Sequence, residues 1–340
     1  MKALIAYGNG DLGLHDNVAM PKLGDYDCLV QNIACGICNG TDLKLKAAKL
    51  RHFDTYPAII GHESTGVIVQ TGRKVRYYKE HDIVLRSGLE NTSEYYSLWG
   101  GFAEFGRVVD CRAMAEDGVS FDEGLITQQI IPSKINPVDA IMLITLKEIY
   151  SALDRLAFKE GIQATVAGDG PVGLALAQLI KLRGAAFVAL SGHHDDRLEA
   201  AVRLGADVVT NSLHKTLQTA LHECQIDKLD AYVDAVGRMG NLTEALQVIK
   251  EDGTIALYGI GLERNQGIDW YAGPYNWRIH SVQWPLPRWE HKAHDAVIKL
   301  VLDGKINLKD YVTHQLPIAN YAEGFHLVEN RKALKVALTF

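Results

Sequence analysis

The sequence predicts an α/β protein in which a doubly wound parallel sheet is inserted into a second, β-rich domain. Short apolar runs between turn residues fill residues 1–110, and strands alternate with helices at βαβ spacing over roughly 160–262. The length of 340 residues also favours two domains over one. We therefore expect residues 1–150 and 283–340 to form the β-rich domain and residues 151–282 to form the parallel-sheet domain.

The composition excludes several classes of protein. The chain is 47% apolar and 22% charged, carries a formal net charge of −6 and has no long basic run, so nucleic-acid binding is not expected. No stretch is long and apolar enough to cross a bilayer, and MKALIAYGNG becomes polar too early for a signal peptide. The five cysteines are too few for a disulfide framework, which fits a reducing compartment. We expect a cytoplasmic protein without membrane or nucleic-acid partners.

The strands of the β-rich domain are predicted from four apolar runs: KALIAY, DCLVQNIAC, TGVIVQTG and HDIVLRSG. Turn-forming glycines punctuate this region: Gly61, Gly66, Gly72, Gly100 and Gly101. A polar, aromatic loop, LENTSEYYSLW, follows the fourth run. From about residue 138, the segment DAIMLITLKEIYSALDRLA has apolar residues at helical spacing and predicts a helix.

The middle of the chain alternates strands with helices. ATVAGDGPVGLALAQLIKLRG predicts a strand, a glycine turn and a helix, and AFVALSG predicts the next strand. DDRLEAAVRLGA predicts a helix that Asp195 or Asp196 caps and Gly205 ends. The alternation continues to the strand GTIALYGIG, and the tail from about residue 283 closes on the strand-like KVALTF.

The glycine turn GDGPVG supplies Gly168, Gly170 and Gly173 in G-x-G-x-x-G spacing. It follows a strand, opens a helix and begins a βαβ series, which is the context that this motif requires. The first glycine permits the tight turn, the second lets the backbone approach a pyrophosphate, and the third lets the helix pack on the strand. Together with Pro171 and Val172, these glycines predict a Rossmann dinucleotide site whose helix start faces the phosphates.

The second strand of the series, AFVAL, is not followed by the acid that usually holds the ribose 2′-hydroxyl of NAD. Ser191 and Gly192 stand at that place, so a 2′-phosphate is not repelled. Several side chains there can donate hydrogen bonds to such a phosphate: Ser191, His193, His194 and Arg197. The sequence therefore favours NADP(H) over NAD(H). The alternative is that the histidines are solvated loop residues and that NAD(H) binds.

Two further stretches carry candidate metal ligands. CGICNGTDLK contains Cys35 and Cys38, and IIGHESTGVIV contains His62 and Glu63. A redox pair of the two cysteines would need a βαβ context, which this β-rich region lacks. Cys38 and His62 instead offer the sulfur and nitrogen atoms that bind zinc. They are separated by 23 residues, so spacing alone does not make them neighbours.

These motifs, in this order and spacing, resemble the zinc-type medium-chain alcohol dehydrogenase family over essentially the whole chain. The resemblance rests on CGICNGTDLK, PAIIGHESTGVIVQTG, HDIVLRSG, GGFAEF and GDGPVGLALAQLIKLRGA. It implies a GroES-like catalytic domain, a Rossmann domain and a nicotinamide held beside a catalytic zinc. It also implies a homodimer or homotetramer that acts on a small-molecule substrate.

The resemblance assigns roles to individual residues. Cys38 and His62 would bind the catalytic zinc, and Glu63 would lie beside it as an exchangeable ligand. Thr41 would contact the reacting hydroxyl and relay its proton. Lys44 stands where the family has a relay histidine, and a lysine can relay protons only when its pKa is lowered.

Three departures from the family pattern leave parts of the site open. Asn39 and Gly40 both precede Thr41 where the family has one residue, so Asn39 could share the role of the threonine. The third protein ligand of the family maps to Ile144, which cannot bind metal. Either Glu148 or Glu63 then completes the site, or zinc binding is weak or lost. The lobe SGLENTSEYYSLWGG has no cysteine, so we expect no structural zinc.

We therefore expect a dehydrogenase that transfers hydride between a nicotinamide and an alcohol or carbonyl, with one zinc per chain as Lewis acid. By resemblance, the missing structural lobe and the GHE motif favour a polyol, sugar or cyclitol as substrate. Two alternatives stay open. One is a zinc-free NADPH-dependent quinone or enone reductase, which the absent third ligand favours and the pair Cys38 and His62 disfavours. The other is a non-catalytic nucleotide-binding protein.

Overall fold

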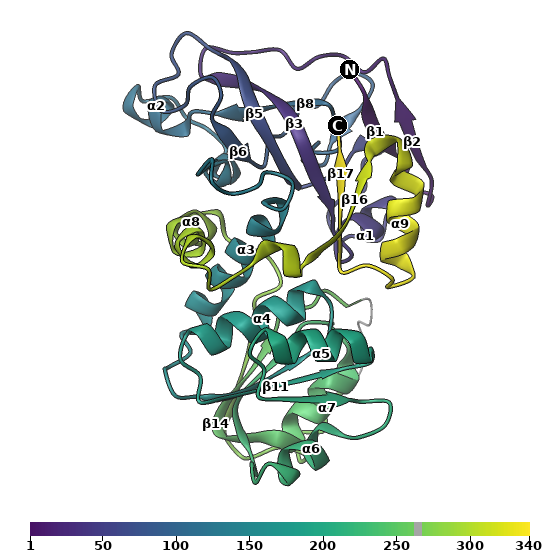
Figure 1. The fold of residues 1–340 in the computed structure, drawn as a ribbon, viewed down its shortest axis with the longest axis vertical. Helices are drawn as coiled ribbons and strands as arrows, with labels where there is room; N and C mark the ends of the chain where they lie inside the picture. Colours follow the sequence, from purple (N-terminus) through teal and green to yellow (C-terminus); the bar gives the residue numbers. More distant parts are fainter. Residues whose placement is uncertain (262–266) are drawn as a thin grey trace. The chain divides into compact units, whose positions relative to one another are not determined.

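The computed structural model describes residues 1–261 and 267–340 and divides the chain into two compact units (Figure 1). The first unit combines Met1–Lys147 with Glu290–Phe340, and the second unit is Glu148–Trp289. The first unit has two sheets, the second unit has one, and each unit has its own buried core, so each is described by itself.

The boundaries between the units lie three residues before and seven residues after the predicted ones. Helix α3 (Ile141–Leu156) runs through the first boundary, so its two ends belong to different units. Near the second boundary, Arg155 donates a hydrogen bond of 3.0 Å to the carbonyl of Trp284, which attaches that segment to the second unit. The sequence pattern marks the ends of helices and strands and does not show such side-chain attachments.

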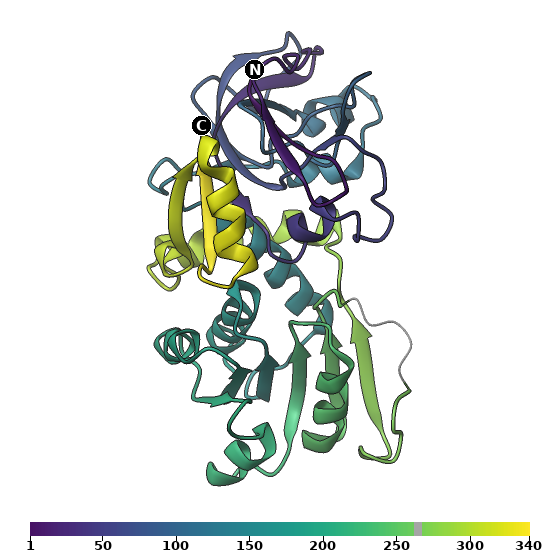
Figure 2. The ribbon, with the colours of Figure 1, turned by 90° about the vertical axis from the view of Figure 1, so that its right-hand side faces the viewer.

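A seven-stranded sheet forms the centre of the first unit, in the order β16-β17-β3-β5-β6-β9 with β8 added to β3. The strands are β3 (Asp27–Ile37), β5 (Glu63–Thr71), β6 (Ile83–Leu85), β8 (Phe105–Val109), β9 (Ile130–Ile131), β16 (Val312–Pro317) and β17 (Lys335–Thr339). β17 pairs antiparallel with β3, so that Leu338 lies opposite Cys35. Figures 1 and 2 show the yellow C-terminal strands beside β3, so segments from both ends of the chain build one sheet.

Smaller elements complete the first unit. A four-stranded sheet has the order β2-β1-β4-β7, with β1 (Ala3–Ala6), β2 (Leu12–His15), β4 (Ala58–Ile59) and β7 (Tyr96–Ser97). The helical elements are α1 (Asp42–Lys46), α2 (Cys111–Glu116), part of α3, most of α8 (Pro287–Leu302), α9 (Tyr321–Glu329) and 3-10 turns at Glu123–Thr127, Leu308–Asp310 and Ile318–Asn320. The core packs residues from both chain segments, including Leu4, Ile37, Phe102, Phe325 and Leu338. Burial of this apolar surface holds the two segments together.

A six-stranded sheet forms the second unit, in the order β12-β11-β10-β13-β14-β15, and every neighbouring pair is parallel. The strands are β10 (Gln163–Ala167), β11 (Phe187–Gly192), β12 (Val208–Asn211), β13 (Leu229–Asp234), β14 (Ile249–Leu257) and β15 (Trp277–Ser281). The helices are α4 (Pro171–Leu182), α5 (Asp195–Arg203), α6 (Leu217–Glu223) and α7 (Met239–Val248). With β10 as the first strand, the order is 3-2-1-4-5-6, which is the Rossmann order. The predicted fold class is confirmed.

The strand order of the second unit reverses between β10 and β13. In open parallel sheets, ligands bind beyond the carboxyl ends of the strands at this reversal. The glycine turn at residues 168–173 directly follows β10, so it lies at the place where a ligand is expected. Within the described part of the chain, no helix has the length and apolar character needed to cross a bilayer.

Candidate metal centre and dinucleotide site

The pairing of two strands brings the candidate metal ligands together in the first unit. β3 ends at Ile37, immediately before Cys38, and β5 begins at Glu63, immediately after His62. The two strands are antiparallel, with Gly36 opposite Glu63. This register closes the gap of 23 residues. The ligand atoms of Cys38, His62 and Glu63 lie within 4.8 Å of one another.

Two glycines make room for this arrangement. A Cβ atom on Gly36 would lie 2.5 Å from Oε2 of Glu63, so a side chain there would displace that carboxylate from its present position. Gly61 has a φ of +101°, which favours glycine, and a Cβ atom there would lie 2.7 Å from the backbone nitrogen of Phe102. The local sequence IIGHE therefore sets the position of the histidine and the glutamate.

Asp42 orients the candidate ligands, and the sequence analysis missed it. It is fully buried, and its Oδ2 accepts the backbone N–H of Cys38 at 2.8 Å. Its Oδ1 lies 3.5 Å from Nδ1 of His62, and within the described residues neither atom has a hydrogen-bond partner. A histidine that binds metal usually directs its other ring nitrogen at a carboxylate. Asp42 thus faces Nδ1 and leaves Nε2 of His62 for a metal.

The electrostatics of His62 fit a metal ligand. Burial alone lowers the pKa of His62, but the Asp42 carboxylate and the Cys38 sulfur raise that pKa well above its ordinary value. The same negative groups that attract a proton attract a divalent cation. A sulfur, an imidazole with a carboxylate behind it and a further carboxylate form a donor set that zinc accepts. The residues present therefore fit zinc.

Glu63 makes a buried ion pair that the sequence did not reveal. Nζ of Lys335, on β17, lies 2.7 Å from Oε1 and 2.6 Å from Oε2 of the Glu63 carboxylate, and Thr145 donates to Oε1 at 2.8 Å. Burial raises the pKa of Glu63, but the neighbouring Lys335 and His62 lower it, with a net decrease. Glu63 is therefore ionised, and Lys335 competes with a metal for its oxygen atoms.

The structure places the remaining predicted catalytic residues as follows. Thr41 directly precedes α1, and its hydroxyl does not cap that helix. Lys44 lies within α1 and is half-buried, and burial lowers its pKa, which a proton relay requires. Glu148 begins the second unit and is not a member of the ligand cluster formed by the described residues. The catalytic roles of Thr41 and Lys44 and the ligand role of Glu148 stay predictions.

Two aromatic side chains, Trp99 and Phe53, form a wall beside the candidate metal ligands. The ring of Trp99 lies 5.3 Å from that of His62, and the ring of Phe53 lies 5.2 Å from that of Trp99, measured between centroids. Trp99 has a φ of +70°, which is strained for a bulky side chain and costs on the order of 1–3 kcal/mol. Backbone strain of this kind is found most often at active and binding sites. The wall gives one side of the candidate ligand cluster an apolar, planar surface.

The glycine turn of the second unit has the geometry of a phosphate-binding turn. Gly168 has a φ of +121° and donates its N–H to the carbonyl of Ser191 at 2.8 Å. A Cβ atom on Gly173 would lie 1.8 Å from the carbonyl oxygen of Gly168, so α4 can approach β10 only with glycine there. A Cβ atom on Gly170 would meet nothing within 4 Å, so this face of the turn is open. The first turn of α4, with Pro171 and Val172, presents its backbone to that space.

The structure corrects one premise of the cofactor prediction. The sequence shows no acid directly at the end of β11, yet the structure places the carboxylate of Asp169 there. Its Oδ2 accepts the backbone N–H groups of His193 at 2.6 Å and His194 at 2.8 Å. Ser191 and Arg197, two of the predicted phosphate donors, are buried. The premise that no carboxylate lies at this strand end is wrong, because a residue of the glycine turn supplies it.

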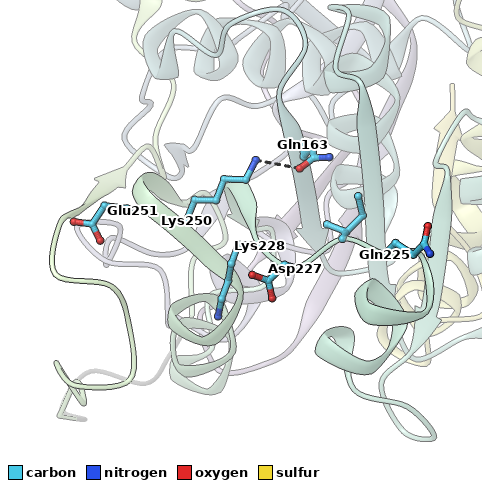
Figure 3. A pocket seen from close by; sticks show the side chains of 7 residues that line it. Gln163, Gln225, Asp227, Lys228, Lys250 and Glu251 are labelled. Carbon is cyan, nitrogen blue, oxygen red and sulfur yellow. Dashed lines mark hydrogen bonds between the residues drawn. The ribbon is translucent and has the colours of Figure 1, made fainter.

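A separate pocket of about 570 Å³ lies on the second unit (Figure 3). Its lining consists of Gln163, Gln225, Ile226, Asp227, Lys228, Lys250 and Glu251. Nζ of Lys250 donates to Oε1 of Gln163 at 3.0 Å. Gln163 is the first residue of β10, whereas the glycine turn follows the last. The pocket therefore lies near the amino end of β10, whereas the glycine turn lies at its carboxyl end.

Comparisons with known proteins agree with the fold and the site. The family described as "Alcohol dehydrogenase GroES-like domain" matches residues 24–115, and the family described as "Zinc-binding dehydrogenase" matches residues 171–276. The chain belongs to the zinc-type medium-chain dehydrogenase/reductase family and is an oxidoreductase of the alcohol or polyol dehydrogenase type. The first unit is accordingly a GroES-like domain and the second a Rossmann domain.

Individual relatives are distant in sequence, but the match covers at least 95% of the length of each one named here. An uncharacterized zinc-type alcohol dehydrogenase-like protein, YdjL, of Escherichia coli (strain K12) is 24% identical over 100% of this chain and 99% of its own. Sorbitol dehydrogenase of Ovis aries is 23% identical over 99% of this chain and 95% of its own. The solved structure of alcohol dehydrogenase TADH from Thermus sp. ATN1 superposes with a TM-score of 0.82 at 22% identity and covers 100% of both chains.

A substitution in the glycine turn tests its role in binding. Gly170 has a φ of −76°, which alanine adopts freely, and an added methyl group would enter open space. Gly170→Ala is therefore expected to leave the melting temperature unchanged and to weaken NAD(P)H binding by at least about tenfold, because the methyl group fills the space that a pyrophosphate needs. Thermal denaturation and NAD(P)H fluorescence measure the two effects.

Gly240→Ala is the matched control for this substitution. Gly240 lies in α7 of the same unit, and an added Cβ atom there also meets nothing within 4 Å. The control should bind NAD(P)H as the wild type does. Equal affinities for Gly170→Ala and the wild type would show that the turn does not hold the pyrophosphate.

Proposed function

We propose that the chain is an NAD(P)-dependent dehydrogenase that interconverts a secondary or primary alcohol of a polyol, sugar or cyclitol and the corresponding carbonyl, with one zinc ion per chain. The observation that carries this proposal is the cluster of Cys38, His62 and Glu63, because their ligand atoms converge within 4.8 Å and Asp42 stands behind the histidine. Such a set of metal donors with an orienting carboxylate is hard to explain in a protein that only binds a nucleotide.

Each residue of the centre has a separate task in this mechanism. Cys38 and Nε2 of His62 would hold the zinc, and the Asp42 carboxylate, 3.5 Å from Nδ1, would orient the ring of His62. Glu63 serves as the third, exchangeable ligand, with Glu148 as the alternative. Zinc held there would supply a Lewis acid for the substrate oxygen and so a lower pKa of the alcohol. The hydroxyl of Thr41 would accept the proton of that alcohol and at the same time pass its own proton on toward Lys44.

Proton removal continues away from the metal. Lys44 lies three residues after Thr41, and burial lowers the pKa of its amine, which favours a role as the acceptor at the end of this relay. The second unit holds the dinucleotide at Gly168, Gly170 and Gly173. The nicotinamide carries the hydride, and the protein supplies orientation and electrostatics.

The substrate class rests on two observations. Trp99 and Phe53 form an apolar wall beside His62, and such a surface packs against the C–H face of a carbohydrate or polyol chain. One of the similar proteins is a sorbitol dehydrogenase. The wall is compatible with such a substrate, and the similarity to a sorbitol dehydrogenase supports a polyol, sugar or cyclitol over a short simple alcohol.

Metal analysis and a substrate panel test the proposal together. Mass spectrometry of freshly purified protein should find about one zinc per chain. Sorbitol, xylitol, inositol, ethanol and an enone are then assayed with NAD(H) and NADP(H). Turnover of a polyol that chelation of zinc abolishes supports the proposal. Enone reduction without zinc would replace it with a zinc-free reductase, and binding of NAD(P)H without turnover of any substrate would leave a nucleotide-binding protein.

We also propose that the chain forms a homodimer or homotetramer through β15. This strand pairs with β14 on one side, and within the described residues no strand pairs with its other edge. Large side chains at or near it are exposed: Trp270, Tyr271, Tyr275 and Ile279. An unpaired edge beside exposed apolar side chains favours pairing with a second copy.

Light scattering after size exclusion tests this assembly. The wild type should elute at a dimer or tetramer mass. Ile279→Asp should shift it toward the monomer, because a charge on an edge strand opposes pairing. Leu213→Asp, on an exposed residue outside the strands of the same unit, is the control and should keep the wild-type mass. A monomeric wild type would contradict the assembly.

A further inference from the structure

The carboxylate of Asp169 occupies the end of β11, although the residue belongs to the glycine turn after β10. Oδ2 of Asp169 accepts three donors: the N–H of His193 at 2.6 Å, the N–H of His194 at 2.8 Å and the ring Nδ1 of His194 at 2.9 Å. The residue is only 8% exposed. The loop after β11 is thus folded around this carboxylate.

Gly192 leaves the space that the Asp169 side chain occupies. A Cβ atom on Gly192, the last residue of β11, would lie 2.5 Å from Cβ and 2.6 Å from Oδ2 of Asp169. Only glycine therefore fits at the strand end while Asp169 keeps its position. In the usual Rossmann arrangement, the acid that binds the ribose stands at the end of this strand. Here that position is a glycine, and the carboxylate at the strand end comes from Asp169 of the glycine turn.

The carboxylate is charged and has one oxygen atom outside its hydrogen bonds to the loop. Burial raises the pKa of Asp169, but the hydrogen bonds from His193 and His194 lower it, with a net decrease. The three hydrogen bonds from the loop all reach Oδ2, and Oδ1 takes part in none of them. A fixed negative charge with a free acceptor atom attracts a hydroxyl and repels a phosphate.

We propose that Asp169 determines the choice of dinucleotide: its Oδ1 accepts the 2′-hydroxyl of the adenosine ribose, and its charge excludes a 2′-phosphate, so NAD(H) binds in preference to NADP(H). This inference rests on the proposed function, because it assumes that the glycine turn holds a dinucleotide. It reverses the preference for NADP(H) that the sequence suggested, since that preference required that no carboxylate lie at the end of β11.

Direct binding measurements separate this inference from the proposed function. Dissociation constants of NADH and NADPH are measured by fluorescence on the wild-type chain. We expect NADH to bind at least about tenfold more tightly than NADPH. Tighter binding of NADPH would overturn the role of Asp169 and leave the dehydrogenase proposal intact. If neither dinucleotide binds, the proposed function itself fails.

Asp169→Asn removes the charge and keeps an oxygen acceptor for the loop. The ratio of the NADPH to the NADH dissociation constant should fall by about tenfold or more. Asp196→Asn is the control, because it removes an exposed charge from the start of α5 and should change the ratio by less than about twofold.

An unchanged ratio in Asp169→Asn would show that Asp169 only folds the loop. Thermal denaturation checks that the variant is folded. If the variant is not folded, the ratio of the NADPH to the NADH dissociation constant of the wild type decides whether Asp169 has the proposed role. Tighter binding of NADPH is incompatible with a charged Asp169 beside the ribose.

Discussion

Replacement of Cys38 with serine is expected to remove the zinc and to lower kcat for the alcohol by about a thousandfold or more. In the proposed centre Cys38 supplies the sulfur ligand, and zinc held there would contribute several kcal/mol to stabilising charge on the substrate oxygen, where each factor of ten in rate corresponds to about 1.4 kcal/mol. Zinc content by mass spectrometry and initial rates measure the two effects. Binding of NAD(P)H should persist, because the glycine turn belongs to the other unit.

Cys224→Ser is the matched control for the loss of zinc. Cys224 is exposed, lies in the second unit and is not part of the ligand cluster found among the described residues. This variant should keep both zinc and activity. Zinc retained in Cys38→Ser at the wild-type level would contradict the assigned ligand set.

Replacement of Lys335 with methionine is expected to destabilise the first unit strongly. The methionine keeps most of the side-chain volume but leaves the buried Glu63 carboxylate without its cation, at a cost of roughly 3–5 kcal/mol. In a unit of about this size, such a loss lowers the melting temperature by on the order of 10 °C. Thermal denaturation of the zinc-free protein measures the effect without competition from the metal.

Two comparisons show whether the ion pair is responsible. The double variant Glu63→Gln with Lys335→Met removes both charges and should recover much of the lost stability. Lys46→Met breaks another lysine–glutamate pair, at 2.6 Å from Glu329, but Glu329 is 40% exposed, so its cost should stay below about 1 kcal/mol. Equal destabilisation in both lysine variants would assign the effect to lost packing and not to buried charge.

Much of the fold was predictable because it follows from local patterns. Helical spacing from about residue 138 foretold α3, and the G-x-G-x-x-G spacing within a strand–helix series foretold the parallel sheet. The segments α3 and β10 carry these signals in consecutive residues. The unit boundaries depend instead on side-chain bonds such as that of Arg155 to Trp284, which consecutive residues do not encode.

The candidate site was less predictable, because its supporting contacts join distant residues. Cys38 and His62 become neighbours through the register of β3 and β5, and sequence could suggest this only by resemblance. Asp42 could have been found, since it lies four residues after Cys38 at the start of a short helix. Lys335 is 272 residues from Glu63, and no local pattern links them. Asp169 was missed because its position after β10 concealed a side chain that reaches the end of β11.

The construction of one sheet from both chain segments has a consequence for folding during synthesis. The ribosome makes Cys38, His62 and Glu63 early, but β17 and Lys335 emerge only after the whole Rossmann unit has been completed. Domains tend to fold as they emerge from the ribosome. The second unit can therefore fold before the last strands of the first unit have been synthesised. A nascent chain that stalls before β17 exposes the open edge of β3 and a buried carboxylate without its cation. Unfinished chains therefore expose an unpaired strand edge and an unpaired carboxylate that chaperones and proteases can detect. In completed chains, β17 covers that edge of β3 and Lys335 pairs with the carboxylate.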